Sequence, residues 1–206
     1  MNMKRLAVIA LTALSALLAT APYAHADTNC STTYSTFQTI TGNLVVPNNA
    51  TCVLSAGASV TGNATVGTSS TLIMQGGTVT GNVQGSNCGV VVLITVAVSG
   101  NVQIQNCVGT STYPYGGFVE ASSVGGDFQC HNNTTAQYPC VLFLSSVKGN
   151  AQVQNNVSSF PSVIAGNTIA KNLQCQNNTP APTNMGVKNT VTGNPGQSNE
   201  AQCLNF

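Results

Sequence analysis

Three residues close together in the chain carry side chains suited to acid–base chemistry: Glu120, Asp127 and His131. Hydrolysis of a glycosidic bond needs two carboxyl groups beside it, and a lyase needs a base, commonly with acidic calcium ligands nearby. The single arginine of the chain is Arg5, so no guanidinium is near to hold an acidic sugar. The alternative for His131 is a solvated surface residue. We treat the three residues as catalytic candidates and leave open whether the protein is an enzyme, although the sequence argues against one.

Aromatic residues in proline-containing loops form a second group of candidates. They occur at comparable places in successive segments of the chain, so the folded protein would place them in a line. Exposed rings in a line can stack on sugar rings, because a tyrosine combines an apolar face with a polar hydroxyl. The alternative is that the rings fold over the core and close the loops. The residues are Tyr113, Tyr115, Tyr138 and Phe160.

Glutamines form a third group, because they recur in short alternating segments such as VQIQN and AQVQN. If these segments stack as strands, the amides form a flat row that can bind a repetitive ligand such as a glycan chain. The same row can equally be a soluble face that avoids charge. One column contains Gln103, Gln129, Gln152 and Gln174, and the column beside it contains Gln105, His131, Gln154 and Gln176.

The segments that position these residues follow a repeat. VTGN stands at 60–63, 79–82 and 191–194, with ITGN at 40–43 and VSGN at 98–101. The third position recurs every 19 to 26 residues, with Lys171 in place of glycine once, and alternating apolar and polar residues follow each tetrad. Such a period is typical of a solenoid with one coil per repeat. We therefore predict an all-β, single-domain parallel β-helix of about eight coils with a period near 20, and favour the right-handed form over a β-sandwich.

Each position of the tetrad has an expected role in that fold. The valine points into the rod, and the residue after it points outward. The glycine suits either a backbone with φ > 0 or a close contact between backbones. The asparagines at the fourth position, with Asp127 once, would form a ladder that satisfies corner backbone groups, the alternative being a ladder that binds a ligand. The outward threonines Thr41, Thr61, Thr80 and Thr192 make only one broken column, which argues against ice binding.

The N-terminal residues have the layout of a secretory signal peptide. Lys4 and Arg5 precede an apolar run over 6–18, and Ala24-His25-Ala26 gives a small-residue cleavage pattern. We expect residues 1–26 to be removed, residues 27–206 to form the solenoid domain, and no membrane span to remain. The cleaved chain would have three lysines, no arginine and four acids, which excludes a nucleic-acid surface.

Eight cysteines follow the leader, and an even number in an exported chain indicates disulfides. Metal binding is the rival interpretation, but there is no CxxC pair and one histidine remains, so we expect neither a metal nor another cofactor. Pairing between neighbours would tie both ends of the domain, and Pro195 with Cys203 would close the C-terminal end. The expected pairs are Cys30–Cys52, Cys88–Cys107, Cys130–Cys140 and Cys175–Cys203.

Three stretches carry a resemblance: SSVGGDFQC at 122–130, KNLQCQNNTPAPT at 171–183 and GNPGQSNEAQC at 193–203. With the leader, they resemble secreted bacterial parallel β-helix (β-solenoid) repeat proteins of unassigned function. The resemblance implies a secreted or periplasmic protein, and solenoids of this kind have many unrelated roles. We expect a non-enzymatic structural or adhesive element at the cell surface or in the extracellular matrix. The alternative is a carbohydrate-binding or polysaccharide-acting β-helix. Expected partners are glycans or other surface components, and lateral self-association is expected at high concentration.

Overall fold

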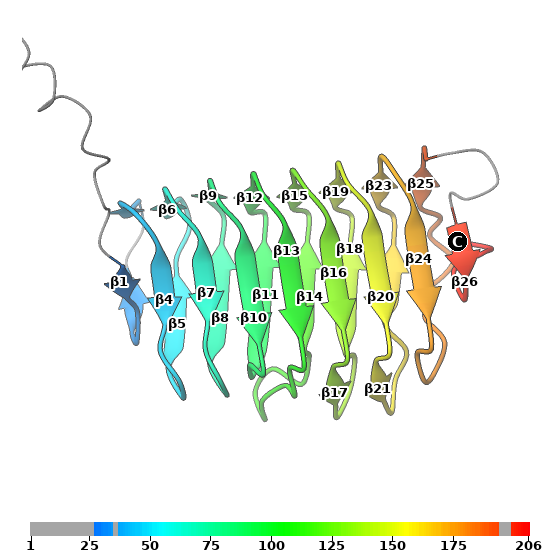
Figure 1. Ribbon diagram of the computed structural model, residues 1–206, viewed down its shortest axis with the longest axis horizontal. Coiled ribbons are helices and arrows are strands. Elements are labelled where there is room, and N and C mark those ends of the chain that lie inside the picture. The colour runs from blue at the N-terminus through cyan, green and yellow to red at the C-terminus, as the bar shows by residue number, and fades with distance from the viewer. Residues whose placement is uncertain (1–26, 35–36, 194–198) are drawn as a thin grey trace, which may run out of the picture.

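The computed structural model describes residues 27–34, 37–193 and 199–206 of the chain. It is an all-β rod in which parallel strands stack coil upon coil along the long axis (Figure 1). The chain makes about seven turns with a period near 22 residues, slightly fewer and longer than the sequence predicted. The difference arises in the later coils, where loops lengthen the spacing between equivalent residues from 19 or 20 to as much as 26.

Three parallel sheets run the length of the rod, and each coil contributes one strand to most of them in turn. Sheet A contains β1 (Thr28–Asn29), β4 (Leu44–Val46), β7 (Ala64–Val66), β10 (Val83–Ser86), β13 (Val102–Gln105), β16 (Phe128–His131), β20 (Ala151–Gln154), β24 (Leu173–Gln176) and β26 (Asn199–Ala201). Sheet B contains β2 (Thr33–Tyr34), β5 (Thr51–Leu54), β8 (Thr71–Gln75), β11 (Val90–Ile94), β14 (Gly117–Glu120), β18 (Cys140–Phe143) and β22 (Val163–Ala165).

Sheet C is made of the two-residue strands at the tetrads. It contains β3 (Thr39–Ile40), β6 (Ser59–Val60), β9 (Thr78–Val79), β12 (Ala97–Val98), β15 (Ser123–Val124), β19 (Ser146–Val147), β23 (Thr168–Ile169) and β25 (Thr190–Val191). A small fourth sheet joins β17 (Thr134–Thr135) to β21 (Val157–Ser158). Within the described residues no helix is long and apolar enough to cross a membrane, and the predicted leader lies outside them.

The core is built from columns of inward residues that alternate in size. In sheet A, Phe128 pairs in register with Val102 on one side and Ala151 on the other, and all three are fully buried. The small alanine leaves room for the phenylalanine ring of the neighbouring coil. The predicted inward valines of sheet C are buried as expected from Val60 to Val147, whereas Val191 in the last tetrad is half-buried.

Two roles were predicted for the tetrad glycines, and the structure shows that close contact between backbones of neighbouring coils is the general one. Only Gly42 has a left-handed backbone, with φ of 94°. At Gly100, a Cβ would lie 2.4 Å from the side-chain oxygen of Asn82 and 2.7 Å from the carbonyl oxygen of Gly81. The left-handed residues mostly lie at the other two corners. After β11, β14 and β18 of sheet B they are Thr95, Ala121 and Leu144, with φ between 45° and 54°. After the later strands of sheet A they are asparagines, with φ between 53° and 57° at Asn87, Asn106, Asn132, Asn155 and Asn177.

All eight cysteines are paired, in the four neighbour pairs expected from the sequence, with Cα–Cα distances between 4.4 and 6.3 Å. Cys30–Cys52 joins the first two coils. Cys175–Cys203 joins β24 to the residues that follow β26. β26 itself pairs with β24 and is the last strand of sheet A. Disulfides of this number indicate an oxidising compartment. Pro195 lies outside the described residues.

Candidate functional site

The three acid–base candidates do not form one site. Asp127 is the corner residue before β16, and its carboxylate accepts hydrogen bonds from the backbone N–H and the side-chain amide of Asn150, at 2.6 and 3.1 Å. Glu120 ends β14 on the outer face of sheet B, whereas His131 ends β16 in sheet A. Within the described residues no three His, Cys, Asp or Glu side chains cluster as metal ligands. The candidates are therefore spread over two sheets and a corner.

His131 differs from the solvated residue expected from the sequence. It is half-buried between Gln105 and Gln154, its partners in register on the neighbouring strands. Its Nε2 atom is buried and has no hydrogen-bond partner. Burial disfavours the charged ring, so the pKa of His131 is lowered from its usual 6.5. A neutral imidazole in an amide column is a packing residue, and its partners in register are amides, which lack the charge of a carboxylate that could orient the ring for catalysis.

The fourth residues of the tetrads form the predicted ladder, which we call the corner ladder. Each side-chain oxygen accepts a hydrogen bond from the backbone N–H of the equivalent residue one coil later, at 2.6 to 3.3 Å. Asp27 begins the series by accepting a bond from the side chain of Asn43 at 3.0 Å. These oxygens are occupied within the protein, which supports the structural interpretation. The other members are Asn63, Asn82, Asn101, Asp127, Asn150 and Asn172.

Two further ladders, which the sequence analysis missed, occupy the other two corners. The buried amide ladder lies between sheets A and B and contains Asn133, Asn156, Asn178 and Gln202. The serine–asparagine ladder lies between sheets B and C and contains Ser122, Ser145, Asn167 and Asn189. Their asparagines and serines are almost fully buried. The sequence signal was the doublet NN at 132–133, 155–156 and 177–178, whose first member has φ > 0 and whose second points inward.

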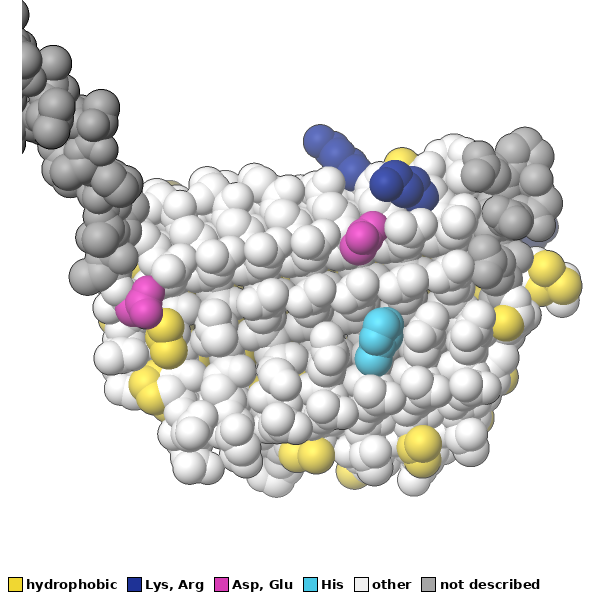
Figure 2. Space-filling view, viewed as in Figure 1, with side chains coloured by type: hydrophobic (Ala, Val, Ile, Leu, Met, Phe, Trp, Pro, Cys, Tyr) yellow, Lys and Arg dark blue, Asp and Glu magenta, His cyan; other side chains and the backbone are white. Residues whose placement is uncertain are grey.

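The glutamine row is continuous in the structure. Each Nε2 donates to the Oε1 of the next glutamine at 2.8 to 3.1 Å, from Gln84, which the sequence analysis did not include, through Gln103, Gln129 and Gln152 to Gln174. Uncharged polar side chains and backbone cover most of this face, with one histidine among them, charged residues near the upper edge and at the left end, and hydrophobic residues mainly at the ends and along the lower edge (Figure 2). The outer surface of sheet A is thus a flat, nearly uncharged amide surface.

The aromatic candidates lie over a different sheet. Tyr113, Tyr115 and Tyr138 are half-buried and pack on apolar residues of the outer face of sheet B, while Phe160 is 46% exposed. The ring centroids of Tyr115 and Tyr138 are 6.2 Å apart and nearly parallel, and those of Tyr138 and Phe160 are 5.3 Å apart. The rings therefore form the expected line, but most of it covers sheet B. Glutamines and aromatics cannot hold one ligand together, because they face outward from different sheets.

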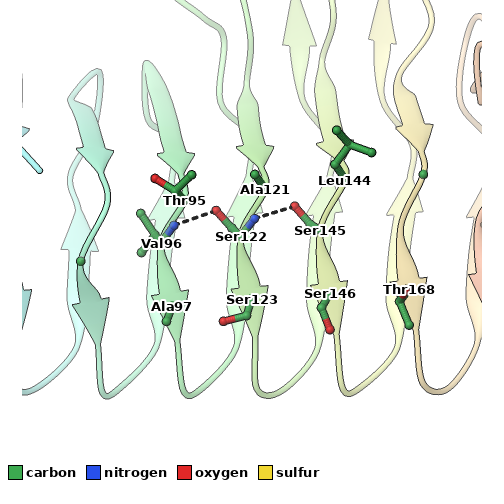
Figure 3. A pocket seen from close by; sticks show the side chains of 12 residues that line it. Thr95, Val96, Ala97, Ala121, Ser122, Ser123, Leu144, Ser145, Ser146 and Thr168 are labelled. Carbon is green, nitrogen blue, oxygen red and sulfur yellow. Dashed lines mark hydrogen bonds between the residues drawn. The ribbon is translucent and has the colours of Figure 1, made fainter. Parts of the chain in front are cut away.

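The largest hollow of those described is a shallow groove of about 400 Å³ along the corner between sheets B and C. Figure 3 shows Ser122 and Ser145 in a row, with their hydroxyls bonded to the backbone nitrogens of Val96 and Ser122 in the preceding coils. The outward hydroxyls of Ser123, Ser146 and Thr168 line its side. No titratable side chain lines this groove in the described part of the chain, so a base to activate a serine is missing there.

Comparisons of the chain with protein-family models, with curated proteins and with solved structures found no match. The function must therefore be inferred from the geometry of the molecule itself. That geometry provides three surfaces: the amide surface of sheet A, the aromatic surface of sheet B and the hydroxyl-lined groove between sheets B and C.

Proposed function

We propose that the protein is a non-enzymatic structural or adhesive element that works outside the cytoplasm, at the cell surface or in its matrix. The observation that carries the proposal is the presence of a side-chain ladder at each of the three corners of the coil. Each rung satisfies a backbone N–H, and in many cases also a side-chain amide, of an adjacent coil, so the polar groups hold the rod together. The four disulfides add cross-links that suit an exported protein.

The distribution of charge supports the same proposal. The carboxylate of Asp127 serves the corner ladder, and Glu120 and His131 lie on different sheets. Hydrolysis of a glycosidic bond requires two carboxyl groups that flank the scissile bond, which this arrangement does not provide. A rigid rod with long uncharged faces is instead suited to contact with other surfaces.

A test combines localisation with a search for turnover. We expect a tagged chain to be found in the envelope or extracellular fraction with all cysteines oxidised, and the purified protein to leave neutral and acidic polysaccharides intact. Asp127→Asn is the key variant, because asparagine is the usual residue of the corner ladder and the change removes only the charge. Turnover that disappears in Asp127→Asn, or in Glu120→Gln or His131→Gln, would overturn the proposal. So would a cytoplasmic protein with reduced cysteines.

Glycan binding is the second candidate function, and the continuous glutamine row favours it. Each amide uses one N–H and one acceptor position in the row, and the planar group has a second N–H and a second lone pair for a sugar hydroxyl. Neighbouring strands of a sheet lie about 4.8 Å apart, so the row offers equally spaced donors to a chain of repeating units. We infer that a linear glycan would lie along the rod axis over β13, β16 and β20.

Replacement of glutamines by threonine tests this candidate, because Thr65 occupies the same column one coil before Gln84. We expect the triple variant Gln103→Thr, Gln129→Thr and Gln152→Thr to lose retardation in gels that contain the bound polysaccharide. The matched control is Gln75→Thr, since Gln75 is an exposed glutamine of sheet B. Equal migration of parent, triple variant and control in every polysaccharide gel would rule out glycan binding by the row.

A further inference from the structure

The outer face of sheet B carries a column of apolar residues parallel to the rod axis. Successive strands contribute one residue each in direct register, and Ile73, Val92, Val141 and Val163 are less than 10% exposed although they point away from the main core. The column consists of Val53, Ile73, Val92, Phe118, Val141 and Val163. Tyrosines from the loops that precede β14 and β18 cover much of it, and two hollows are left between them.

The two hollows share a wall of aromatic rings. The smaller, of about 160 Å³, is lined by Val92, Ile94, Tyr113, Tyr115 and Phe118. The larger, of about 210 Å³, is lined by Tyr115, Phe118, Tyr138, Val141, Phe143, Val163 and Met185. The centroids of the Tyr115 and Phe118 rings are 5.3 Å apart. A drug-sized ligand typically needs a pocket of 300 Å³ or more, so these hollows fit only a small group.

One charged residue belongs to this surface. Glu120 follows Phe118 by two positions on β14, so both point to the outer face, and it pairs in register with Ile94 and Phe143. Ile94 lines the smaller hollow and Phe143 lines the larger. Among the described residues that line the two hollows there is no lysine, arginine or histidine. The surface therefore combines aromatic faces with a half-buried carboxylate beside the hollows, whose described lining contains no cation.

We propose that this aromatic surface binds a small quaternary ammonium group, and that the larger hollow is the binding site. Ring faces carry negative electrostatic potential and attract a cation, and Glu120 adds a full negative charge. The methyl groups of such a cation are apolar and match the aliphatic lining. A sugar or an anion fits poorly, because the lining offers few polar groups apart from tyrosine hydroxyls. This binding site is independent of the structural and glycan-binding functions proposed above.

Choline and its neutral isostere provide the first test. In 3,3-dimethylbutan-1-ol a carbon replaces the charged nitrogen, so size and shape are retained while the charge is lost. The chain contains no tryptophan, so tyrosine dominates its fluorescence, and three of the five tyrosines, Tyr113, Tyr115 and Tyr138, line the hollows. We expect choline chloride to change the fluorescence saturably, and the isostere to bind at least about 3-fold more weakly. Equal affinity for the two probes, or no saturation by choline, would overturn the proposal.

Three variants locate the site. Glu120→Gln removes the charge and Tyr138→Leu removes a ring while keeping an apolar side chain, and each should weaken choline binding by about 3- to 30-fold. Tyr34→Leu is the matched control, because Tyr34 lies in the first coil away from both hollows, and it should bind choline as the parent does. Circular dichroism and thermal unfolding verify that the variants fold. If Glu120→Gln, a conservative surface change, binds choline like the parent, the proposed role of the carboxylate is wrong.

The same cation occurs as free choline in solution and as a lipid headgroup. A second experiment, with lipid vesicles, distinguishes these two ligands. Phosphatidylcholine vesicles should sediment the protein, and free choline should compete, if the headgroup is the natural ligand. Phosphatidylglycerol vesicles serve as the control without the cation. Binding of choline without sedimentation by phosphatidylcholine assigns the site to a free small molecule. Failure of both choline and phosphatidylcholine to bind overturns the site itself.

Discussion

The side-chain oxygen of Asn82 accepts a hydrogen bond from the backbone N–H of Asn101, the equivalent residue of the next coil, at 2.8 Å. The residue before Asn101 is Gly100, and a Cβ there would lie 2.4 Å from the same oxygen. The asparagine ladder and the glycine column therefore act together, since the rungs of 2.6 to 2.9 Å form where the preceding residue is glycine. Lys171 is the exception, and the hydrogen bond from Asn172 to Asn150 beside it is the longest of the series at 3.3 Å.

This relationship predicts that Gly100→Ala is strongly destabilising. The added methyl group would meet Asn82 and the Gly81 carbonyl, so one rung must open or the coils must separate locally, at a cost of about 2–4 kcal/mol. Urea unfolding of parent and variant measures this difference. Gly186→Ala is the control: its φ is 79°, but no atom lies within 4 Å of the new methyl group. We expect the control to cost only about 1–2 kcal/mol of backbone strain. Equal losses in the two variants would contradict the contact explanation.

The buried amide ladder leads to a second prediction. Asn156 is fully buried, and its oxygen accepts hydrogen bonds from the backbone and side-chain nitrogens of Asn133, both at 3.0 Å. Asn156→Ala would remove the acceptor of the buried Asn133 backbone N–H and the side-chain donor to the Cys130 carbonyl, so we expect a loss of about 2–4 kcal/mol in the free energy of unfolding.

The adjacent asparagine supplies the control for that experiment. Asn155 is exposed and left-handed, with φ of 54°, which glycine adopts without strain. Asn155→Gly should therefore change stability by less than about 1 kcal/mol in the same denaturant titration. A loss in Asn155→Gly as large as that in Asn156→Ala would mean that the doublet acts through the turn and not through the ladder.

Much of the fold was predictable because the repeat constrains it. The period of the tetrads fixes the coil, and the alternation in segments such as AQVQN fixes which residues point inward. The backbone conformation of the tetrad glycines could not be predicted from the sequence, because a positive φ and a close contact between backbones both favour glycine. The coil count was slightly high because it counted tetrads: the eight tetrad strands of sheet C bound seven intervals, which agrees with about seven turns.

The surfaces were harder to predict than the fold. The serine–asparagine ladder changes residue type from Ser145 to Asn167, so a search for identical letters does not find it. The half-burial of His131 depends on the glutamines above and below it, which only the register reveals. The segregation of amides and aromatics follows from the triangular path of the coil, since residues 10 to 15 positions apart can face in different directions around the rod.

The environment of His131 predicts a dependence of stability on pH. Its pKa is lower in the folded protein than in the unfolded chain, because the half-buried ring loses solvation. Between the two pKa values the unfolded chain binds more protons than the folded protein. The free energy of unfolding is therefore not reduced by this residue above about pH 6.5, and it falls as the pH decreases toward the folded pKa. We expect the denaturation midpoint to be lower at pH 5 than at pH 7.5.

His131→Gln is the matched variant, because glutamine is the residue at the equivalent positions 105, 154 and 176. The variant should retain its midpoint across this pH range apart from the contribution of the carboxyl groups, which the parent shares. A pH dependence of the same size in both proteins would show that His131 does not cause it.

The last prediction concerns the C-terminal end of the rod. Gln202 completes the buried amide ladder, as its side-chain oxygen accepts hydrogen bonds from the backbone and side chain of Asn178 at 2.9 and 3.0 Å. Cys203 is bonded to Cys175, and β26 pairs with the otherwise open edge of β24. An open edge can recruit a strand of another molecule, so we expect this segment to block end-to-end assembly. The nearly uncharged lateral faces have no such cover, and we expect the parent to associate laterally, at high concentration only.

Removal of the cover should convert lateral association into end-to-end growth. In the triple variant Cys175→Ser, Gln202→Ala and Cys203→Ser, the segment loses its disulfide and its ladder contacts, and no free thiol remains to cross-link molecules. The lost cross-link spans 28 residues, which corresponds to about 3–4 kcal/mol. Cys88→Ser with Cys107→Ser is the control, since it removes a disulfide from the middle of the rod without exposing an end. Light scattering over a concentration series should show elongated particles for the triple variant alone. If the control grows equally long particles, or the triple variant none, the capping role of residues 199–206 is wrong.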